Sequence, residues 1–216
     1  MVYPYIEGVS LDKILHEGSY TLAEATQWSE QLIESFEIVR SIPVIDWGKG
    51  IDSESENYSE WYDFLFSYLK EQEKKGPRIA DLRYERLVDT INKYQNNIKK
   101  EVNSSALVCA DVNARNYLIT QKRELICIHT PMMWRADPAV PFGDALVHLD
   151  NSLFGKCFKN MTRYPAYRTY LYAAFSAYVI LAYVERFSTE PLEKALPWGG
   201  NRPLLDILDH YLDLLN

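Results

Sequence analysis

The sequence predicts an α+β fold that is mainly α-helical. Amphipathic segments with helical spacing fill most of the first 100 residues and the last 70, whereas short apolar runs between 106 and 128 predict a small group of strands. A chain of 216 residues can bury a core without a disulfide or a metal. Because no internal repeat and no second domain are visible, we expect a single domain over residues 1–216.

Three long helices are predicted before residue 101. Thr21 followed by Glu24 is typical of a capping box, and the apolar residues that follow repeat at helical spacing until Pro43. Further apolar stripes predict helices that begin near Trp61 and end before Gly76, and that run from about 81 to 100. A brief helical turn is expected at 11–15, and residues 43–57 are expected to be irregular.

In the middle of the chain the residue pattern changes from helical spacing to short apolar runs. Apolar runs at 106–109, 117–119 and 125–128 predict three strands, and the five residues between the last two suit a hairpin. Residues 131–143 contain Pro and Gly and are expected to form a loop. Three further helices are predicted at the end of the chain, at about 144–154, 164–187 and 203–215.

Composition and charge argue against several classes of function. The chain has 23 Lys and Arg against 30 Asp and Glu, a formal charge of −7, so a nucleic-acid partner is not expected. Its longest uncharged run, residues 169–184, is shorter than the roughly 20 residues of a membrane span. The N-terminus lacks the pattern of a secretion signal. Three cysteines, Cys109, Cys127 and Cys157, are interpreted as buried thiols in a reducing compartment, so a cytoplasmic protein without a membrane partner is predicted.

A polar loop separates the first predicted strand from the hairpin. It reads Cys-Ala-Asp-Val-Asn-Ala-Arg-Asn over residues 109–116, and such loops often carry catalytic groups. If it turns back on itself, Asp111 and Asn116 point into one cleft and supply a proton acceptor and a metal or phosphate ligand. The alternative interpretation is that Asp111 and Asn113 only hydrogen-bond the amides of the turn.

Residues 107–119 resemble the catalytic loop of the aminoglycoside phosphotransferase and choline kinase-like family. That loop is usually written His-Gly-Asp, four variable residues, Asn, then apolar residues; here Cys109 and Ala110 replace the histidine and the glycine. Residues 3–11 resemble the hinge between the two lobes, 61–65 fall on the expected substrate-lobe helix, and 136–139 resemble a Gly-Asp-Pro-Ala segment. The resemblance implies a protein-kinase-like C-terminal lobe with a small central β-hairpin.

The resemblance also implies a chemistry. Enzymes of this family transfer a phosphoryl group from ATP to a hydroxyl of a small, here possibly cationic, molecule, mainly by positioning and charge neutralisation. Asp111 matches the aspartate that accepts the hydroxyl proton, and Asn116 matches the asparagine that binds Mg²⁺ beside the phosphates. Tyr3 and Tyr5, in the hinge-like segment, are the other residues expected to contact the nucleotide.

Two departures from the family pattern predict weakened or absent activity. His129 stands where the family has its second magnesium ligand, an aspartate, and a neutral imidazole is a poor ligand for a hard cation. Of the nearby carboxylates, Asp137 and Asp144 are the candidates to compensate, although the resemblance implies that Asp137 braces the catalytic loop. The hinge-like segment begins at Met1, so the nucleotide-binding lobe is expected to be absent, truncated or supplied by another chain.

Two functions therefore stay open. The first is a small-molecule phosphotransferase that is impaired or inactive as this chain alone, and the second is a non-catalytic, pseudokinase-like binding or regulatory module. In either case an apolar lobe interface near residues 1–10 predicts self-association or a partner. The acidic residues Asp144, Asp150, Asp206, Asp209 and Asp213 are candidates for a negative wall that attracts cationic substrates, or are solvated helix faces.

Weaker alternatives use the cysteines and histidines. Cys109, Cys127 and His129 could form a soft metal site across neighbouring strands, although only three ligands are available. Cys109 could also be a nucleophile paired with His129 or His148, but a thiol on an apolar strand is usually inert. Core packing is the favoured interpretation of these residues. The tyrosines between 169 and 184 are likewise expected to pack a helix rather than to form a ligand cage.

Overall fold

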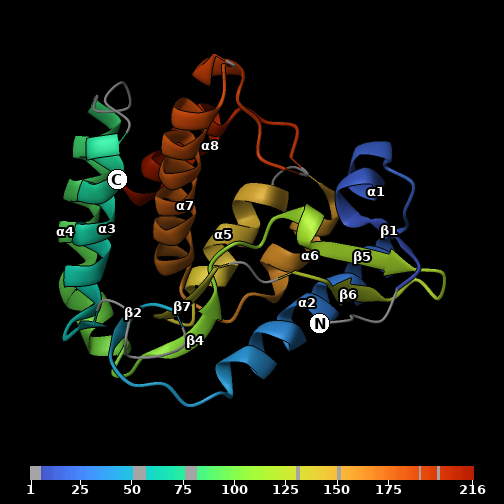
Figure 1. Ribbon diagram of the computed structural model, residues 1–216, viewed down its shortest axis with the longest axis horizontal. Helices are drawn as coiled ribbons and strands as arrows, with labels where there is room; N and C mark the ends of the chain where they lie inside the picture. The colour runs from blue at the N-terminus through green and yellow to red at the C-terminus, as the bar shows by residue number, and fades with distance from the viewer. Residues whose placement is uncertain are drawn as a thin grey trace.

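Helices make up most of the molecule (Figure 1). The computed structural model describes residues 6–50, 57–75, 82–129, 132–149, 152–189, 191–198 and 200–216. Its elements include helices α1 (Leu11–Glu17), α2 (Leu22–Arg40), α3 (Trp61–Lys75), α4 (Leu82–Glu101), α5 (Val140–Leu149), α6 (Leu153–Met161), α7 (Ala166–Phe187) and α8 (Leu204–Leu215), with 3-10 turns η1 (Ala114–Asn116) and η2 (Leu192–Lys194).

The strands form two small antiparallel sheets. One has the order β1 (Gly8–Ser10), β5 (Tyr117–Thr120), β6 (Leu125–Cys127), and the other has the order β3 (Asn57–Tyr58), β2 (Trp47–Lys49), β7 (Met133–Ala136), β4 (Ala106–Cys109). Strands β5 and β6 are the predicted hairpin, with Leu118 opposite Ile126. The mainly helical α+β class is therefore confirmed, but the strands also come from segments far from the middle of the sequence.

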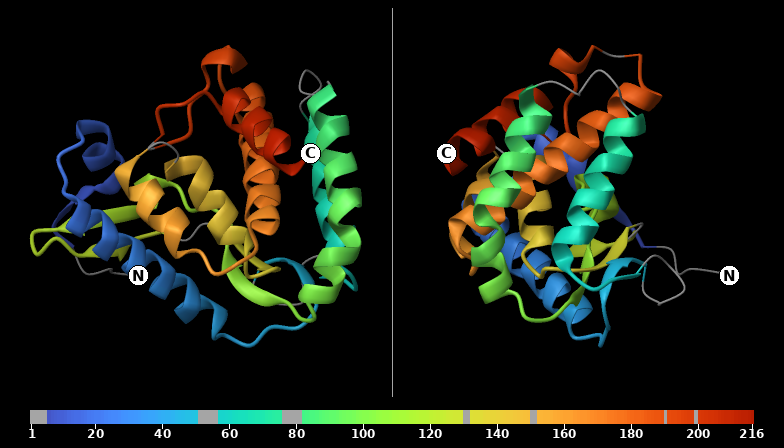
Figure 2. Two further views of the ribbon diagram at one scale, coloured as in Figure 1. Left: turned by 180° about the vertical axis from the view of Figure 1, so that it is seen from behind. Right: turned by 90° about the vertical axis from the view of Figure 1, so that its left-hand side faces the viewer.

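Helix α7 lies at the centre of the helical body. It contacts α5, α8, α3 and α4, and both rear and side views show α3 and α4 running side by side next to it (Figure 2). Helix α5 approaches α7 closely at Gly143, where an added Cβ would lie 2.5 Å from the Cβ of Tyr172. Any larger residue at this position would therefore push the two helices apart.

Helix α2 connects the helical body to the hairpin. Its predicted capping box is confirmed, because the Glu24 amide donates to the Thr21 hydroxyl and the Thr21 amide donates to the Glu24 carboxylate. Trp28, one helical turn further on, is fully buried, and its indole N–H donates a 2.8 Å hydrogen bond to the carbonyl of Arg123 at the tip of the hairpin. The position of the hairpin is thus fixed by contacts to α2.

The long helices predicted before residue 101 are confirmed, whereas the loop predicted at 131–143 is wrong. Its middle forms β7, which pairs with both β2 and β4, and its end is already α5. Pro141 is compatible with the first turn of a helix, where no intrahelical amide bond is lost. The single helix predicted at 144–154 is also wrong, since Ser152 caps a separate helix α6 by accepting a 2.8 Å hydrogen bond from the Gly155 amide.

The segment predicted to be irregular at 43–57 contributes two strands. Strand β2 pairs with β7 through Gly48 and Arg135, and β3 pairs with β2. These strands are only two or three residues long, too short to give an alternating pattern. Within the ranges described above, no helix combines the length and the apolar composition needed to cross a membrane.

Candidate functional site

The loop that carries Asp111 follows directly from β4. The Ala110 amide extends the β4–β7 ladder by donating a 2.8 Å hydrogen bond to the Met132 carbonyl, so Asp111 leaves the sheet at a fixed point. The loop then turns through η1 into β5. Its end is fixed as well, because the Ile128 amide beyond β6 donates to the Asn116 carbonyl at 2.8 Å.

Asp111 and Asn116 are brought together by this turn. The Asn116 Nδ2 donates a 2.9 Å hydrogen bond to the main-chain carbonyl of Asp111. One carboxylate oxygen of Asp111 accepts a 2.7 Å hydrogen bond from Asn113 Nδ2, while Asn113 Oδ1 accepts from the Arg115 amide. Asp111 is half-buried, whereas Asn116 is buried. The turn-bonding alternative thus describes Asn113, while the Asp111 carboxylate is oriented by a neighbouring side chain.

A second carboxylate supports the loop from behind. Asp144 on α5 is buried, and its Oδ2 accepts a 2.5 Å hydrogen bond from the Val112 amide. Burial raises the pKa of Asp144, and the bonds to Val112 and Ser176 and the nearby His148 oppose that rise only in part. Asp144 thus holds the loop through the Val112 amide.

The expectation that Asp137 braces the loop is wrong. Its carboxylate is fully buried and accepts hydrogen bonds from Arg168 Nη2 at 2.6 Å and Arg168 Nε at 2.8 Å. The Tyr172 hydroxyl and the Ala139 amide donate to the same carboxylate. Asp137 therefore ties the start of α5 to α7, and Asp144, seven residues later, takes the role at the loop.

A cleft of about 860 Å³ opens beside Asp111. Asp111, Asp144 and His148 lie along one side of it. One face of α7 also lines the cleft, where Phe175, Val179 and Tyr183 are spaced four apart. Its volume lies within the range of roughly 300–1,000 Å³ that small-molecule sites occupy. Asp111 thus presents an oriented carboxylate to a space large enough for a small molecule.

Two residues that line the cleft, His148 and Trp198, were not predicted from the sequence to do so. His148 is buried, and its Nδ1 lies 3.2 Å from the Trp198 carbonyl, which joins α5 to the segment before α8. Trp198 lines the same cleft from that segment and is 36% exposed. A signal for His148 was present, since it stands one helical turn after Asp144; for Trp198 we find none, because it lies in an irregular segment.

The described residues do not fit Mg²⁺ as the family pattern requires. His129 is exposed two residues after the end of β6 and is the residue next to Ile128, whose amide contacts Asn116. Asn116 is buried and its Nδ2 donates to the Asp111 carbonyl, which leaves only its Oδ1 to face a cation, and Asp137 and Asp144 are held by other groups. Over the described part of the chain, no group of three or more His, Cys, Asp or Glu residues could hold a metal ion.

The structure also tests the alternative roles of the cysteines as metal ligands or as a nucleophile. Cys109 is buried, and burial raises the pKa of its thiol to about 12, so it is protonated and unreactive near neutral pH. Cys127 and Cys157 are half-buried, which corrects the expectation that all three thiols are buried. All three are free. Tyr3 and Tyr5, predicted to contact a nucleotide, lie outside the described residues.

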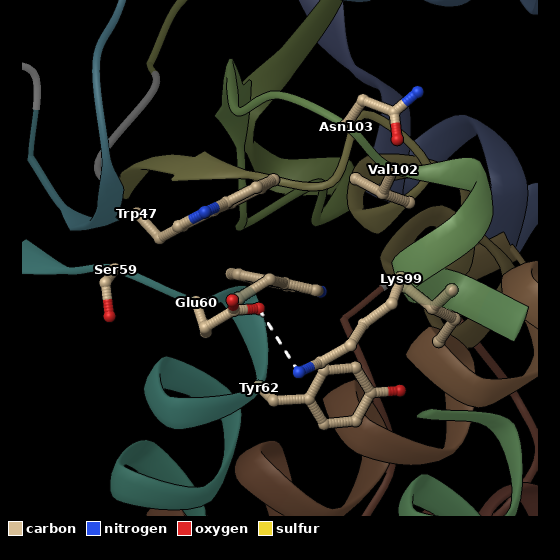
Figure 3. Close-up of a pocket in the computed structure, with 9 residues that line it drawn as sticks. Trp47, Ser59, Glu60, Tyr62, Lys99, Val102 and Asn103 are labelled. Carbon is tan, nitrogen blue, oxygen red and sulfur yellow. Dashed lines mark ion pairs between the residues drawn. The ribbon is translucent and has the colours of Figure 1, made fainter. Parts of the chain in front are cut away.

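A second, smaller hollow lies apart from the Asp111 loop. It has a volume of about 310 Å³ and is lined by residues of β2, the start of α3 and the end of α4 (Figure 3). The Lys99 ammonium lies 3.4 Å from the Glu60 carboxylate at this hollow, and the ring of Tyr62 lies below the pair in the view of Figure 3. No residue predicted from the sequence as a site residue lines it, so it stays outside the candidate site.

The fold of this chain is similar to the folds of solved small-molecule kinases. Among solved structures, a thermostable mutant of aminoglycoside phosphotransferase APH(4)-Ia without ligand aligns with a TM-score of 0.64 at 12% identity. Choline kinase LicA from Streptococcus pneumoniae aligns with a TM-score of 0.60 at 12% identity. Each alignment covers 98% of this chain and 68% of the other.

A ternary complex extends the comparison to a liganded state. The thermostable APH(4)-Ia bound to ADP and hygromycin B aligns with a TM-score of 0.66 at 12% identity, over the same 98% and 68% of the two chains. No protein-family model and no curated protein matches the sequence. The resemblance inferred from the catalytic-loop motif is thus confirmed for the fold, which is kinase-like.

Proposed function

We propose that this chain is the substrate-binding part of a small-molecule phosphotransferase, a single domain that corresponds to the hinge and C-terminal lobe of the aminoglycoside phosphotransferase-like kinases. The observation that carries the proposal is the Asp111 carboxylate, half-buried, oriented by Asn113 and facing the 860 Å³ cleft. Support also comes from the fold shared with an enzyme solved with ADP and hygromycin B.

Within this proposal Asp111 accepts the proton of a substrate hydroxyl as that oxygen attacks a phosphoryl group. A carboxylate within hydrogen-bond reach of the hydroxyl can do this, and its orientation by Asn113 fixes the direction of the acceptor. Asn116 acts mainly by holding the loop closed through the Asp111 carbonyl. In the resemblance, Tyr3, Tyr5 and Asn116 contact ATP, and for this chain that assignment stays a prediction.

Phosphoryl transfer by this chain alone is expected to be weak or absent. When Mg²⁺ is bound it neutralises charge on the phosphates, and the family aspartate that holds it is replaced by His129. This replacement is the specific observation that favours the second function, a non-catalytic module that keeps the cleft for a small molecule. Self-association through residues 1–10 stays a separate prediction, which a light-scattering mass across a range of concentrations would check.

Titration of the full chain with ATP, with and without MgCl₂, separates the two functions. A saturable rise in thermal stability indicates a nucleotide site, because a ligand that binds only the folded state stabilises it by mass action. The variant Asp111→Asn should keep that rise while losing any transfer to an alcohol. No rise at millimolar ATP would leave the binding module as the better description.

A further inference from the structure

We propose that the cleft beside Asp111 accepts an uncharged alcohol with a largely apolar, ring-containing body, rather than a polycation. The inference rests on the proposed function, since it names the substrate class of the same site. It replaces the expectation of a possibly cationic substrate, which rested on the negative charge of the chain and on the family resemblance. The walls of the cleft, its charges and its rim each support it.

A large part of the cleft wall is apolar, although Lys49, Gln72 and Arg186 also line it. Val179 and Ile180 on α7 line it together with Phe175, and Trp134 on β7 packs edge-on against Phe175 with ring centroids 6.3 Å apart. Tyr68 on α3 completes this wall, with its ring 5.0 Å from that of Trp134. A ligand that fills this space buries its own apolar surface, which favours binding.

The acidic groups along the cleft are already neutralised or held. The Glu71 carboxylate lies 2.9 Å from the Lys49 ammonium, which also lies 4.7 Å from the centre of the Tyr68 ring. Asp144 is buried and accepts the Val112 amide. Asp111 and Asp144 form no ion pair in the described ranges, but Asp144 is buried, which leaves Asp111 as the accessible cleft carboxylate without one. One such group suits one hydroxyl, whereas several amines would face apolar walls at a high desolvation cost.

Of the residues predicted as a negative wall, Asp144 lines the cleft but is buried, whereas Asp206, Asp209 and Asp213 do not line it, and Asp150 lies outside the described residues. Asp209 on α8 forms a 2.9 Å ion pair with Arg83 on α4, and Asp213 forms a 2.6 Å ion pair with Arg86. These carboxylates therefore hold α4 against α8. Neither Asp209 nor Asp213 is among the cleft-lining residues. Asp209 and Asp213 therefore stabilise a contact between two helices and do not form a negative wall around the cleft.

The rim of the cleft exposes aromatic side chains. Tyr183 is 46% exposed and Trp198 is 36% exposed, and their ring centroids are 6.5 Å apart. Arg115 of the catalytic loop lies 5.5 Å from the Trp198 ring, which ties the rim to the loop of Asp111. Large apolar groups left in water at the entrance of a pocket are typical of a binding site. They suit a ring-containing body that enters between them.

Calorimetric titration with defined probes tests the inference. The probes are 3-phenylpropan-1-ol as the apolar alcohol, kanamycin as the polycation and glycerol as a polar alcohol. We expect saturable binding of 3-phenylpropan-1-ol with a Kd at least tenfold lower than for either of the others. Tighter binding of kanamycin or glycerol, or no saturable binding of the apolar alcohol, would overturn the inference.

Variants place the bound probe in the cleft. Ile180 is half-buried, so Ile180→Asp sets a charge in the wall at modest risk to folding and should weaken 3-phenylpropan-1-ol binding at least tenfold, while Ile180→Leu restores it. Leu82→Asp, 75% exposed on α4, is the matched control and should not change it. Equal binding of the probe by both aspartate variants would show that it does not bind in the cleft. Because no ATP is present, a failure here is distinct from a failure to bind nucleotide.

Discussion

The side-chain amide of Asn116 donates a 2.9 Å hydrogen bond to the main-chain carbonyl of Asp111, five residues earlier. This bond closes the loop between β4 and β5 into a ring, and it does so from a buried position. The position of the Asp111 main chain thus depends on a residue that does not line the cleft. A loop held at both ends in this way can present a charged group to solvent without losing its shape.

Replacing Asn116 by Ala should therefore cost stability as well as any activity. The change leaves the Asp111 carbonyl with only the weak 3.5 Å contact from the Cys109 thiol, and such a loss typically costs about 1–3 kcal/mol. Urea unfolding measures this cost, with Asn96→Ala on the exposed face of α4 as the control, expected within about 0.5 kcal/mol of the wild type. Equal stability of the two variants would show that the loop holds its shape without the bond.

The ion pair between Asp137 and Arg168 should be a major support of the fold. Both groups are buried, and removal of one partner from a buried pair costs about 3–5 kcal/mol because the other charge is left uncompensated. Arg168→Met should show this loss in urea unfolding. Arg163→Met, an exposed arginine five residues earlier, is the matched control and should lose less than about 1 kcal/mol. Similar values for the two would contradict the assignment.

Glu24 should make stability depend on pH in the acid range. The hydrogen bond from Arg123, followed by those from the amide and the hydroxyl of Thr21, lowers the pKa of Glu24 from its ordinary 4.5 to about 2. A carboxylate with a lowered pKa stabilises the folded state above pH 4.5, and that contribution is lost as the pH falls toward 2.

The variant Glu24→Gln should lack this contribution. The difference in unfolding free energy between wild type and variant is expected to be largest near pH 6 and to shrink steadily down to pH 2. Chemical unfolding at a series of pH values measures it, with Glu34→Gln, exposed on the same helix, as the control. A difference that stays constant with pH would show that the Arg123 contact does not act through the charge of Glu24.

The sequence predicted the elements whose signals are local. Helix α2 was readable because Thr21 and Glu24 form a capping box and the apolar spacing repeats for several turns. Strand β7 was not, because Trp134, Arg135 and Ala136 are all buried, so polar and apolar residues do not alternate. Arg135 is accommodated there by Asn57, 78 residues away, and no local pattern encodes such a contact.

The candidate site also has one part that the sequence predicts and another part that only the structure shows. Asp111, Asn113 and Asn116 lie within six residues, so a motif captures them together. The cleft that Asp111 faces is built from α3, β7, α7 and the segment before α8, which only the tertiary fold brings together. The choice between Asp137 and Asp144 as the brace also required the structure, since it depends on where α5 begins and which of its faces meets the loop.

The last prediction concerns His129, which directly follows the residue whose amide binds the Asn116 carbonyl. An aspartate at this exposed position would offer Mg²⁺ the anionic oxygen that an imidazole lacks. If the chain binds ATP, His129→Asp should make that binding depend more strongly on MgCl₂ and lower the apparent Kd of ATP about tenfold, equivalent to roughly 1.4 kcal/mol. His16→Asp, an exposed histidine on α1, makes the same change of residue elsewhere on the surface. Thermal-shift titration of both variants measures the effect, and an equal response of the two would mean that position 129 does not lie beside the phosphates.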